Sequence, residues 1–227
     1  DTTGKRVISV PHDSHYAGHG THVASIMAGE STGIAPGAQL LCSLVLPDGW
    51  GTLEQVLSGL QWVIDPDGDP KTDDGAHIVN MSWGVSGESL PLWQAVENMV
   101  AMGILPIAAI GNSGPGATCS PGNAPGAIGV GAVDSGGNAP LFSGGGQILS
   151  LGDMYIKPDL SAPGVFIKGL GLQGEYQYLS GTSMAAPHVS GVAALLKSNY
   201  PSIPSAWLRA FLVHGCLEMG EFGQDAR

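Results

Sequence analysis

Short apolar runs alternate along the chain with longer segments whose apolar residues recur at helical spacing. The short runs predict strands at residues 6–10, 40–46, 77–82, 105–110 and 128–133. The longer segments predict helices at residues 52–64, 92–102 and 183–199, and Ser205 is expected to cap a last helix. Alternation of this kind is typical of a three-layer α/β fold, in which helices cover both faces of a mostly parallel sheet. In such sheets the chemistry lies at the carboxyl ends of the strands.

The composition indicates one folded domain over residues 1–227. A hydrophobic content of 43% excludes a disordered chain, so the 36 glycines and 16 prolines indicate tight turns. The net charge of −11 argues against nucleic-acid binding. No apolar run reaches the roughly 18 residues needed to span a bilayer. We therefore expect neither nucleic acid nor a membrane as a partner, and the sequence leaves the oligomeric state open.

Residues 179–188, Leu-Ser-Gly-Thr-Ser-Met-Ala-Ala-Pro-His, carry the most specific signal in the chain. They place Ser183 at or near a helix N-terminus, where unpaired N–H groups and the helix dipole favour negative charge. A hydroxyl at that point can act as a nucleophile, and the N–H groups beside it can receive the oxyanion that its attack creates. The alternative is a capping serine on a core helix. Pro187 favours the first interpretation, because a proline so close to a helix start is otherwise disfavoured.

Two further polar segments stand upstream. Residues 19–22, His-Gly-Thr-His, would by themselves fit a zinc pair or a polar helix face. Residues 111–114, Gly-Asn-Ser-Gly, would by themselves read as a turn. Asn112 follows His19 by 93 residues, and Ser183 follows Asn112 by 71. The order and spacing of the three segments, taken together, are far more specific than any one of them.

In that order the three segments resemble the subtilases, the subtilisin-like serine proteases. The resemblance implies that Ser183 is the nucleophile, that His19 is the general base, and that Asn112 donates a hydrogen bond to the oxyanion. His22 matches a structural position. An α/β-hydrolase is unlikely because its motif needs glycine where Ala185 stands and its histidine follows the serine. A zinc hydrolase lacks any glutamate motif.

The chain departs from the family at the third catalytic residue, an aspartate about thirty residues before the histidine in an Asp-Thr/Ser-Gly turn. Asp1 lies only 18 residues before His19, and no apolar strand precedes it. Asp13 stands in a loop where subtilases usually carry an acidic residue outside the triad. We therefore expect a subtilase domain trimmed at both ends, with little activity by itself. The alternative is that Asp1 completes the triad.

The resemblance also implies the substrate-binding segments. Residues 82–84 (Ser82, Trp83 and Gly84) match one edge of the substrate cleft, and residues 49–51 (Gly49, Trp50 and Gly51) match the opposing edge. An extended peptide would lie between them by strand addition. Cys119 would stand near the floor of the main specificity pocket. The alternative for Trp50 and Trp83 is an ordinary half-buried aromatic.

The three cysteines cannot all pair within the chain. Cys42 lies in an apolar run and is expected to be a buried thiol, while a disulfide of Cys119 with Cys42 or Cys216 stays open. The loop from Asp65 to Asp74 is rich in carboxylates that suit calcium, but its pattern is not that of an EF-hand, which favours a solvated acidic loop. We therefore expect no metal at the catalytic site and no cofactor.

The function implied by the resemblance is that of a secreted or extracytoplasmic serine endopeptidase acting on proteins or peptides. The competing hypothesis is a catalytically silent subtilase fold that binds or scaffolds, because the triad aspartate is missing from this chain.

Overall fold

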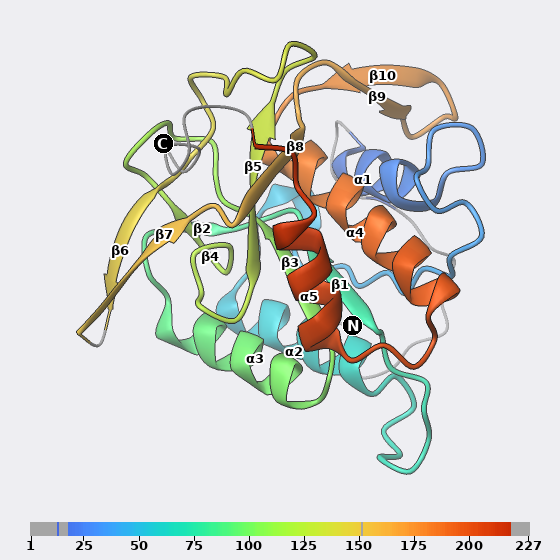
Figure 1. Cartoon of the computed structure of the whole chain (residues 1–227). Coiled ribbons are helices and arrows are strands. Elements are labelled where there is room, and N and C mark those ends of the chain that lie inside the picture. The colour runs from blue at the N-terminus through green and yellow to red at the C-terminus, as the bar shows by residue number, and fades with distance from the viewer. Residues whose placement is uncertain (1–12, 14–17, 151, 219–227) are drawn as a thin grey trace.

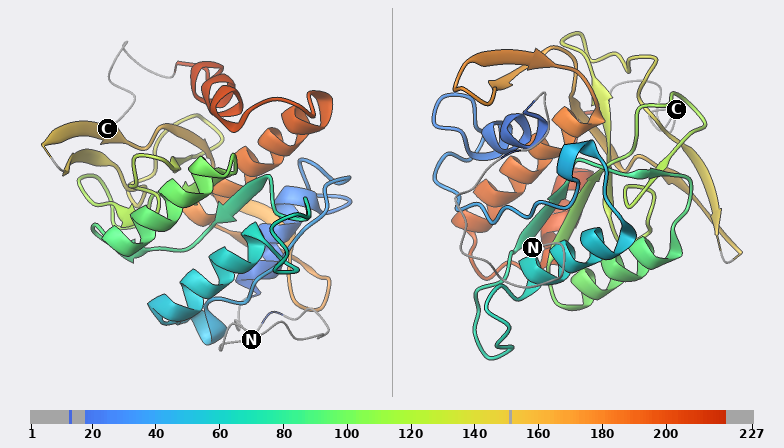
Figure 2. Two further views of the ribbon diagram at one scale, coloured as in Figure 1. Left: turned by 90° about the horizontal axis from the view of Figure 1, so that it is seen from below. Right: turned by 180° about the vertical axis from the view of Figure 1, so that it is seen from behind.

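A parallel sheet stands at the centre of the protein, and helices cover both of its faces (Figures 1 and 2). The computed structural model describes residues 13, 18–150 and 152–218. The sheet holds, in spatial order, β1 (Ile78–Met81), β3 (Leu105–Ala109), β5 (Ile128–Val133) and β8 (Leu160–Pro163). All three neighbouring pairs are parallel. The expected three-layer α/β architecture is confirmed, as are the strands at 77–82, 105–110 and 128–133.

One face of the sheet is covered by α2 (Leu53–Ile64) and α3 (Leu90–Ala101). Val56 and Leu60 from α2 and Val96 and Met99 from α3 are buried in the apolar cluster beneath them. The start of α2 is fixed by a capping box, in which Thr52 and Gln55 each bond the other's backbone N–H. The sequence predicts these helices well because each carries one continuous apolar stripe.

The opposite face is covered by α4 (Thr182–Asn199) and α5 (Ser205–His214). Ser205 is the first helical residue of α5 rather than its cap, because the chain turns into the helix at Pro204. The short helix α1 (His19–Ala28) packs on α4, and Val23, Ile26 and Met184 form the buried contact. Among the described residues, no helix is long and apolar enough to cross a membrane.

Short elements lie at the margins of the main sheet. Their bounds are η1 (Pro47–Gly49), β2 (Val85–Ser86), β4 (Cys119–Ser120), β6 (Gly146–Ser150), β7 (Asp153–Lys157), β9 (Ile167–Leu170) and β10 (Tyr176–Leu179). β2 pairs with β4, β6 with β7, and β9 with β10, all antiparallel. The β9–β10 hairpin lies beside α1, and the β6–β7 hairpin extends away from the helices (Figure 1).

The strand expected at residues 40–46 is wrong. That segment forms no ladder with any described strand, and Leu40, Leu41 and Leu44 are each exposed by two-fifths or more. An apolar run becomes a strand only where a neighbouring strand takes its backbone hydrogen bonds, which local sequence does not reveal. Cys42 is consequently exposed, not buried as expected. The strand predicted at 6–10 lies outside the described residues.

A buried charge network fastens α5 to the sheet. Lys157, only 1% exposed, donates to the Ala127 carbonyl and to Asp159 Oδ2, both at 2.7 Å. Arg209 of α5 binds the other oxygen of Asp159, also at 2.7 Å. Burial lowers the pKa of the Lys157 ammonium, and the neighbouring Asp159 carboxylate opposes that shift. Removing one partner would leave a buried charge unpaired, so the three residues hold β7, β8 and α5 together as a unit.

Candidate active site

Ser183 is the second residue of α4, as the sequence predicts, and its side chain is half-buried. At that position its backbone N–H has no partner within the helix. Pro187 lies one turn further on and has no N–H, so the Ser183 carbonyl oxygen also lacks its usual helical partner. The Ser82 hydroxyl takes that place and donates to the Ser183 carbonyl at 2.8 Å. In return, the Ser183 hydroxyl donates to the Ser82 carbonyl at 3.1 Å.

Asn112 lies just beyond the carboxyl end of β3, on a turn beside the start of α4. Its Oδ1 accepts hydrogen bonds from the Thr182 backbone N–H at 2.9 Å and from the Thr182 hydroxyl at 3.0 Å. The Thr182 hydroxyl oxygen in turn accepts from the Gly111 N–H at 3.2 Å. Because Thr182 engages the carboxamide oxygen, the NH₂ group of Asn112 faces the other way and is free to donate.

The two free donors border one small space beside Gly181. A Cβ atom placed on Gly181 would stand 3.4 Å from Asn112 Nδ2 and 3.7 Å from the Ser183 backbone nitrogen. The third neighbour of that point is Asn112 Oδ1, also at 3.7 Å, which Thr182 already engages. Asn112 Nδ2 and the Ser183 nitrogen therefore both lie near one point at Gly181, and two donors so close together can stabilise a developing oxyanion.

His19 is the first residue of α1, directly after Gly18, whose left-handed backbone (φ 62°) starts the helix. Val23 and Ile26 lie four and seven residues further on, so they share one face of α1 with His19. That face packs on Met184, the neighbour of Ser183. The packing of α1 on α4 thus directs the His19 face toward the start of α4.

Buried polar contacts hold α1 in this place. His22 is fully buried, and its Nε2 donates to the Ile167 carbonyl of β9 at 3.1 Å. Ser25 accepts a hydrogen bond from the Leu170 N–H at 2.9 Å. Asp13 accepts from both the N–H and the hydroxyl of Thr21, and so caps the N-terminus of α1. These contacts support a structural role for His22, while Asp1 lies outside the described residues.

The burial of His22 makes a pH dependence of stability expected. Desolvation lowers the pKa of His22 below its ordinary value, although its bond to the Ile167 carbonyl opposes the shift. The unfolded chain then takes up this proton at a higher pH than the folded chain. The contribution of His22 to the free energy of unfolding is therefore fully present above about pH 6.5. As the pH falls below that value, the contribution is lost by up to about 1.4 kcal/mol per pH unit. Between pH 7.5 and pH 5.5, the melting temperature should fall less in His22→Gln than in the unmodified protein. An equal fall in the two proteins would show that His22 is not the source of the pH dependence.

The expected substrate-binding residues divide into two groups. Gly84 lies against β4, where an added Cβ would stand 2.9 Å from the Ser120 carbonyl oxygen and 3.0 Å from Cys119 Cβ. The Cys119 sulfur in turn lies 2.7 Å from the place of a Cβ on Gly111. Ser82, Gly84 and Cys119 are therefore joined through direct contacts to the Ser183 and Asn112 segments. Trp83 lies just after the end of β1. Its side chain is half-buried and packs against the apolar cluster beneath α2 and α3.

The segment of Gly49, Trp50 and Gly51 is not part of a described strand, although Trp50 has an extended backbone. Gly49 ends the 3-10 turn η1, and Trp50 is 85% exposed rather than half-buried. The described neighbours of Gly51 are Val45 and Leu46, which belong to its own loop. A role for this segment in binding substrate stays a prediction.

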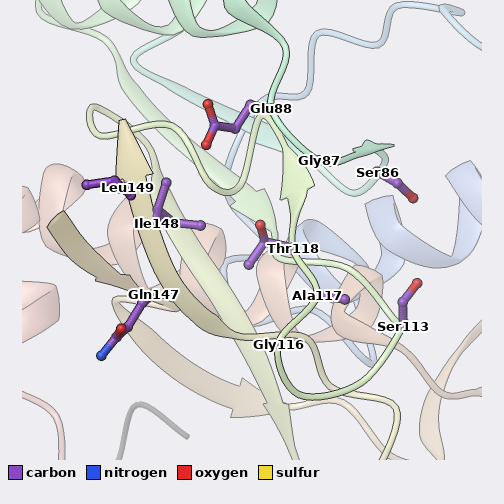
Figure 3. A pocket seen from close by; sticks show the side chains of 10 residues that line it. All are labelled: Ser86, Gly87, Glu88, Ser113, Gly116, Ala117, Thr118, Gln147, Ile148 and Leu149. Carbon is purple, nitrogen blue, oxygen red and sulfur yellow. The ribbon is translucent and has the colours of Figure 1, made fainter. Parts of the chain in front are cut away.

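A pocket of about 540 Å³ begins at Ser113, next to Asn112 (Figure 3). Its walls are the loop before β4, the turn after β2 and the inner edge of β6. Figure 3 shows Ser86 and Ser113 on one side of it and Gln147 and Leu149 on the other. Glu88 is its one ionisable lining residue. The pocket therefore adjoins the candidate site without including Ser82, Gly84 or Cys119.

The three cysteines are all free thiols, which settles the open question of a disulfide. Burial raises the pKa of the Cys119 thiol, although a hydrogen bond with Ser86 opposes the shift. A neutral thiol is a poor nucleophile and a poor metal ligand at neutral pH. Cys119 therefore acts here as a small, weakly polar side chain that packs against Gly84 and Gly111.

The acidic loop brings one oxygen each of Asp65, Asp67 and Asp74 within 4.8 Å of one another. Two of those carboxylates already bond their own loop. Asp65 accepts from the Gly68 N–H, and Asp67 accepts from the N–H of Asp69. These bonds are turn contacts of a solvated loop.

Sequence reasoning missed three residues of the site, namely Thr182, Asn80 and Ser190. Thr182 orients Asn112, whereas Asn80 donates to the Ser82 hydroxyl and accepts from the Ser190 hydroxyl. The one signal for them was Pro187, whose missing N–H implies that another group must satisfy the Ser183 carbonyl.

The chain belongs to the subtilase family, because the model of the Subtilase family matches residues 9–226. It is 38% identical over 204 residues to the "Thermostable alkaline protease" of Halalkalibacterium halodurans, covering 87% of this chain and 51% of that protein. It is 36% identical over 209 residues to "Subtilisin BL" of Lederbergia lenta, covering 89% and 71%. The chain thus spans about half the length of the first of these relatives.

Solved structures give the same family likeness. A cold adapted subtilisin-like serine proteinase superposes with a TM-score of 0.80 at 33% identity, covering 95% of this chain and 72% of that one. A psychrophilic protease, S41, superposes with a TM-score of 0.76 at 32% identity, covering 88% and 69%. The subtilisin-like fold follows from both.

Proposed function

We propose that this chain is the catalytic domain of a subtilisin-like serine endopeptidase. In this proposal Ser183 is the nucleophile, His19 is the general base, and Asn112 with the Ser183 N–H receives the oxyanion. The observation that carries the proposal is that two donors with no partner among the described residues, Asn112 Nδ2 and the Ser183 nitrogen, lie 3.4 and 3.7 Å from the place of a Cβ on Gly181. The named proteases among its relatives support the same activity.

The reaction would proceed by acyl transfer. The Ser183 hydroxyl turns from the Ser82 carbonyl and passes its proton to His19 as its oxygen attacks the scissile carbonyl carbon. The carbonyl oxygen becomes an oxyanion between Asn112 Nδ2 and the Ser183 N–H. His19 then gives the proton to the leaving amine, and water hydrolyses the acyl-enzyme by the same steps in reverse. No described residue is assigned as the carboxylate that would orient His19.

The substrate would be a protein or peptide in extended form, running past Ser82 and Gly84 beside β2. No cofactor takes part in this chemistry, as is general for the family. The resemblance to subtilases supports a location outside the cytoplasm, which belongs to this proposal. The silent-scaffold alternative is less well supported, because Ser183, Asn112 and His19 are all present and the named relatives are proteases.

Labelling by a fluorophosphonate tests the proposal. In the full-length protein we expect one covalent adduct, mapped to Ser183 by mass spectrometry, together with hydrolysis of casein. His19→Ala should slow both by at least about 100-fold, because the base contributes at least that much. His214→Ala, which changes an exposed histidine at the end of α5, is the matched control. An adduct on another serine, or labelling that His19→Ala leaves unchanged, would refute the assignment.

A further inference from the structure

A chain of hydrogen bonds leaves α4, crosses to β1 and returns to α4 at the candidate nucleophile. The Ser190 hydroxyl donates to Asn80 Oδ1 at 3.0 Å, and Asn80 Nδ2 donates to the Ser82 hydroxyl oxygen at 2.9 Å. The Ser82 hydroxyl then donates to the Ser183 carbonyl at 2.8 Å. Ser82 and Ser190 are 6% and 4% exposed, and Asn80 is partly buried. We call these three residues, Ser190, Asn80 and Ser82, the relay.

The direction of the hydrogen bonds along the relay depends on which acceptor each hydroxyl serves. Ser82 has one hydroxyl proton, and two acceptors compete for it: the Ser183 carbonyl and, if the Asn80 amide were reversed, Asn80 Oδ1. The Ser190 hydroxyl has two acceptors within reach, Asn80 Oδ1 at 3.0 Å and the Ala186 carbonyl at 3.1 Å, and when it donates to Asn80 it holds Oδ1 on its own side. Asn80 can then only donate toward Ser82, and the Ser82 proton is left for the Ser183 carbonyl.

The strand and the helix explain why the relay is built here. Along β1, Val79 and Met81 point into the cluster beneath α2 and α3, so Asn80 points to the opposite face, toward α4. The carbonyl that the relay reaches is the one that Pro187 leaves without a helical partner. A helix end with an unsatisfied carbonyl is free to shift or fray, and here that end carries the hydroxyl and one oxyanion donor.

We propose that Asn80 and Ser190 are positioning residues for Ser183, acting through Ser82. The inference rests on the proposed function and deepens it, because it says what keeps the nucleophile and its N–H in register with Asn112. A displacement near 1 Å at a reacting group costs on the order of 100-fold in rate. The relay is therefore expected to affect turnover more than substrate binding.

The test compares variants of the full-length protein by rate of fluorophosphonate labelling and by kcat and KM. Asn80→Asp keeps the size but has no N–H, and Asn80→Ala has neither group; both should lower labelling and kcat by about 10- to 100-fold, with KM within about twofold. Ser190→Ala should lower them by about 3- to 10-fold. Ser190→Thr should keep the labelling rate and kcat close to those of the unmodified protein, because it retains the hydroxyl. Its extra methyl group can enter the cavity of about 830 Å³ that Ser190 and Asn80 line.

The matched control is Ser143→Ala, since Ser143 is also a buried serine, 8% exposed, and accepts from the Ala132 N–H at 3.0 Å. It should lower the melting temperature as much as Ser190→Ala but leave labelling within about twofold. If the Asn80 and Ser190 variants also leave labelling unchanged, the relay only adds stability and the proposal is wrong.

Hydrogen exchange separates this proposal from the proposed function. In peptides covering residues 180–188, exchange should quicken in Asn80→Asp and Ser190→Ala but not in Ser143→Ala. That result supports positioning even if the unmodified protein shows no labelling at Ser183, in which case only the proposed function fails. Unchanged exchange in the relay variants overturns the positioning proposal whether or not the protein is active.

Discussion

Replacing Ser183 by alanine is expected to lower peptide hydrolysis by about a millionfold, because the hydroxyl is the only group proposed to form the acyl-enzyme. The fold should tolerate the change. The hydroxyl is half-buried and makes one bond, to the Ser82 carbonyl at 3.1 Å, worth about 1 kcal/mol. Its backbone carbonyl, which accepts from the Ser82 hydroxyl, and its backbone N–H are kept.

The measurement is turnover of a chromogenic peptide by the full-length protein, with circular dichroism and thermal unfolding to show that the variant is folded. Ser198→Ala removes an exposed serine from the last turn of the same helix and should keep full activity. A folded Ser183→Ala protein that retained even about one per cent of the turnover would show that another group attacks the substrate.

The sequence predicted the central elements of the fold because their information is local. The helix α2 carries an apolar stripe and a capping box, and β5 is buried along nearly its whole length. The segment 40–46 has a similar apolar run but no hydrogen-bonded neighbour among the described strands, so it stays irregular. The cost of unpaired backbone groups, not side-chain character, decided that case.

The candidate site shows the same limit. Ser183, Asn112 and His19 could be found because each stands in a short motif at a turn or helix end, where backbone geometry constrains the residues. Thr182, Asn80 and Ser190 act through contacts between distant segments, such as the 110-residue separation between Asn80 and Ser190. Sequence periodicity places such residues on a face of a strand or helix but does not say which polar group they meet.

Replacing Asn112 is expected to lower kcat by about 100- to 1000-fold and to change KM little, since its NH₂ group gains a partner only when the oxyanion forms. Two variants separate this donor role from the support of Thr182. Asn112→Ala removes both the donor and the acceptor of the two Thr182 bonds. Asn112→Asp keeps an oxygen for Thr182 but turns a negative charge toward the oxyanion, so its kcat should fall at least as far.

Because Asn112 is exposed, neither change should cost much stability, and thermal unfolding should confirm folded proteins. Ser113→Ala, at the exposed neighbouring residue, is the control and should keep kcat within about twofold. The Asp variant decides between the two explanations. If it retains nearly full kcat while the Ala variant loses it, then Asn112 acts by holding Thr182 and the helix start, and the oxyanion must be received by the Ser183 N–H without it.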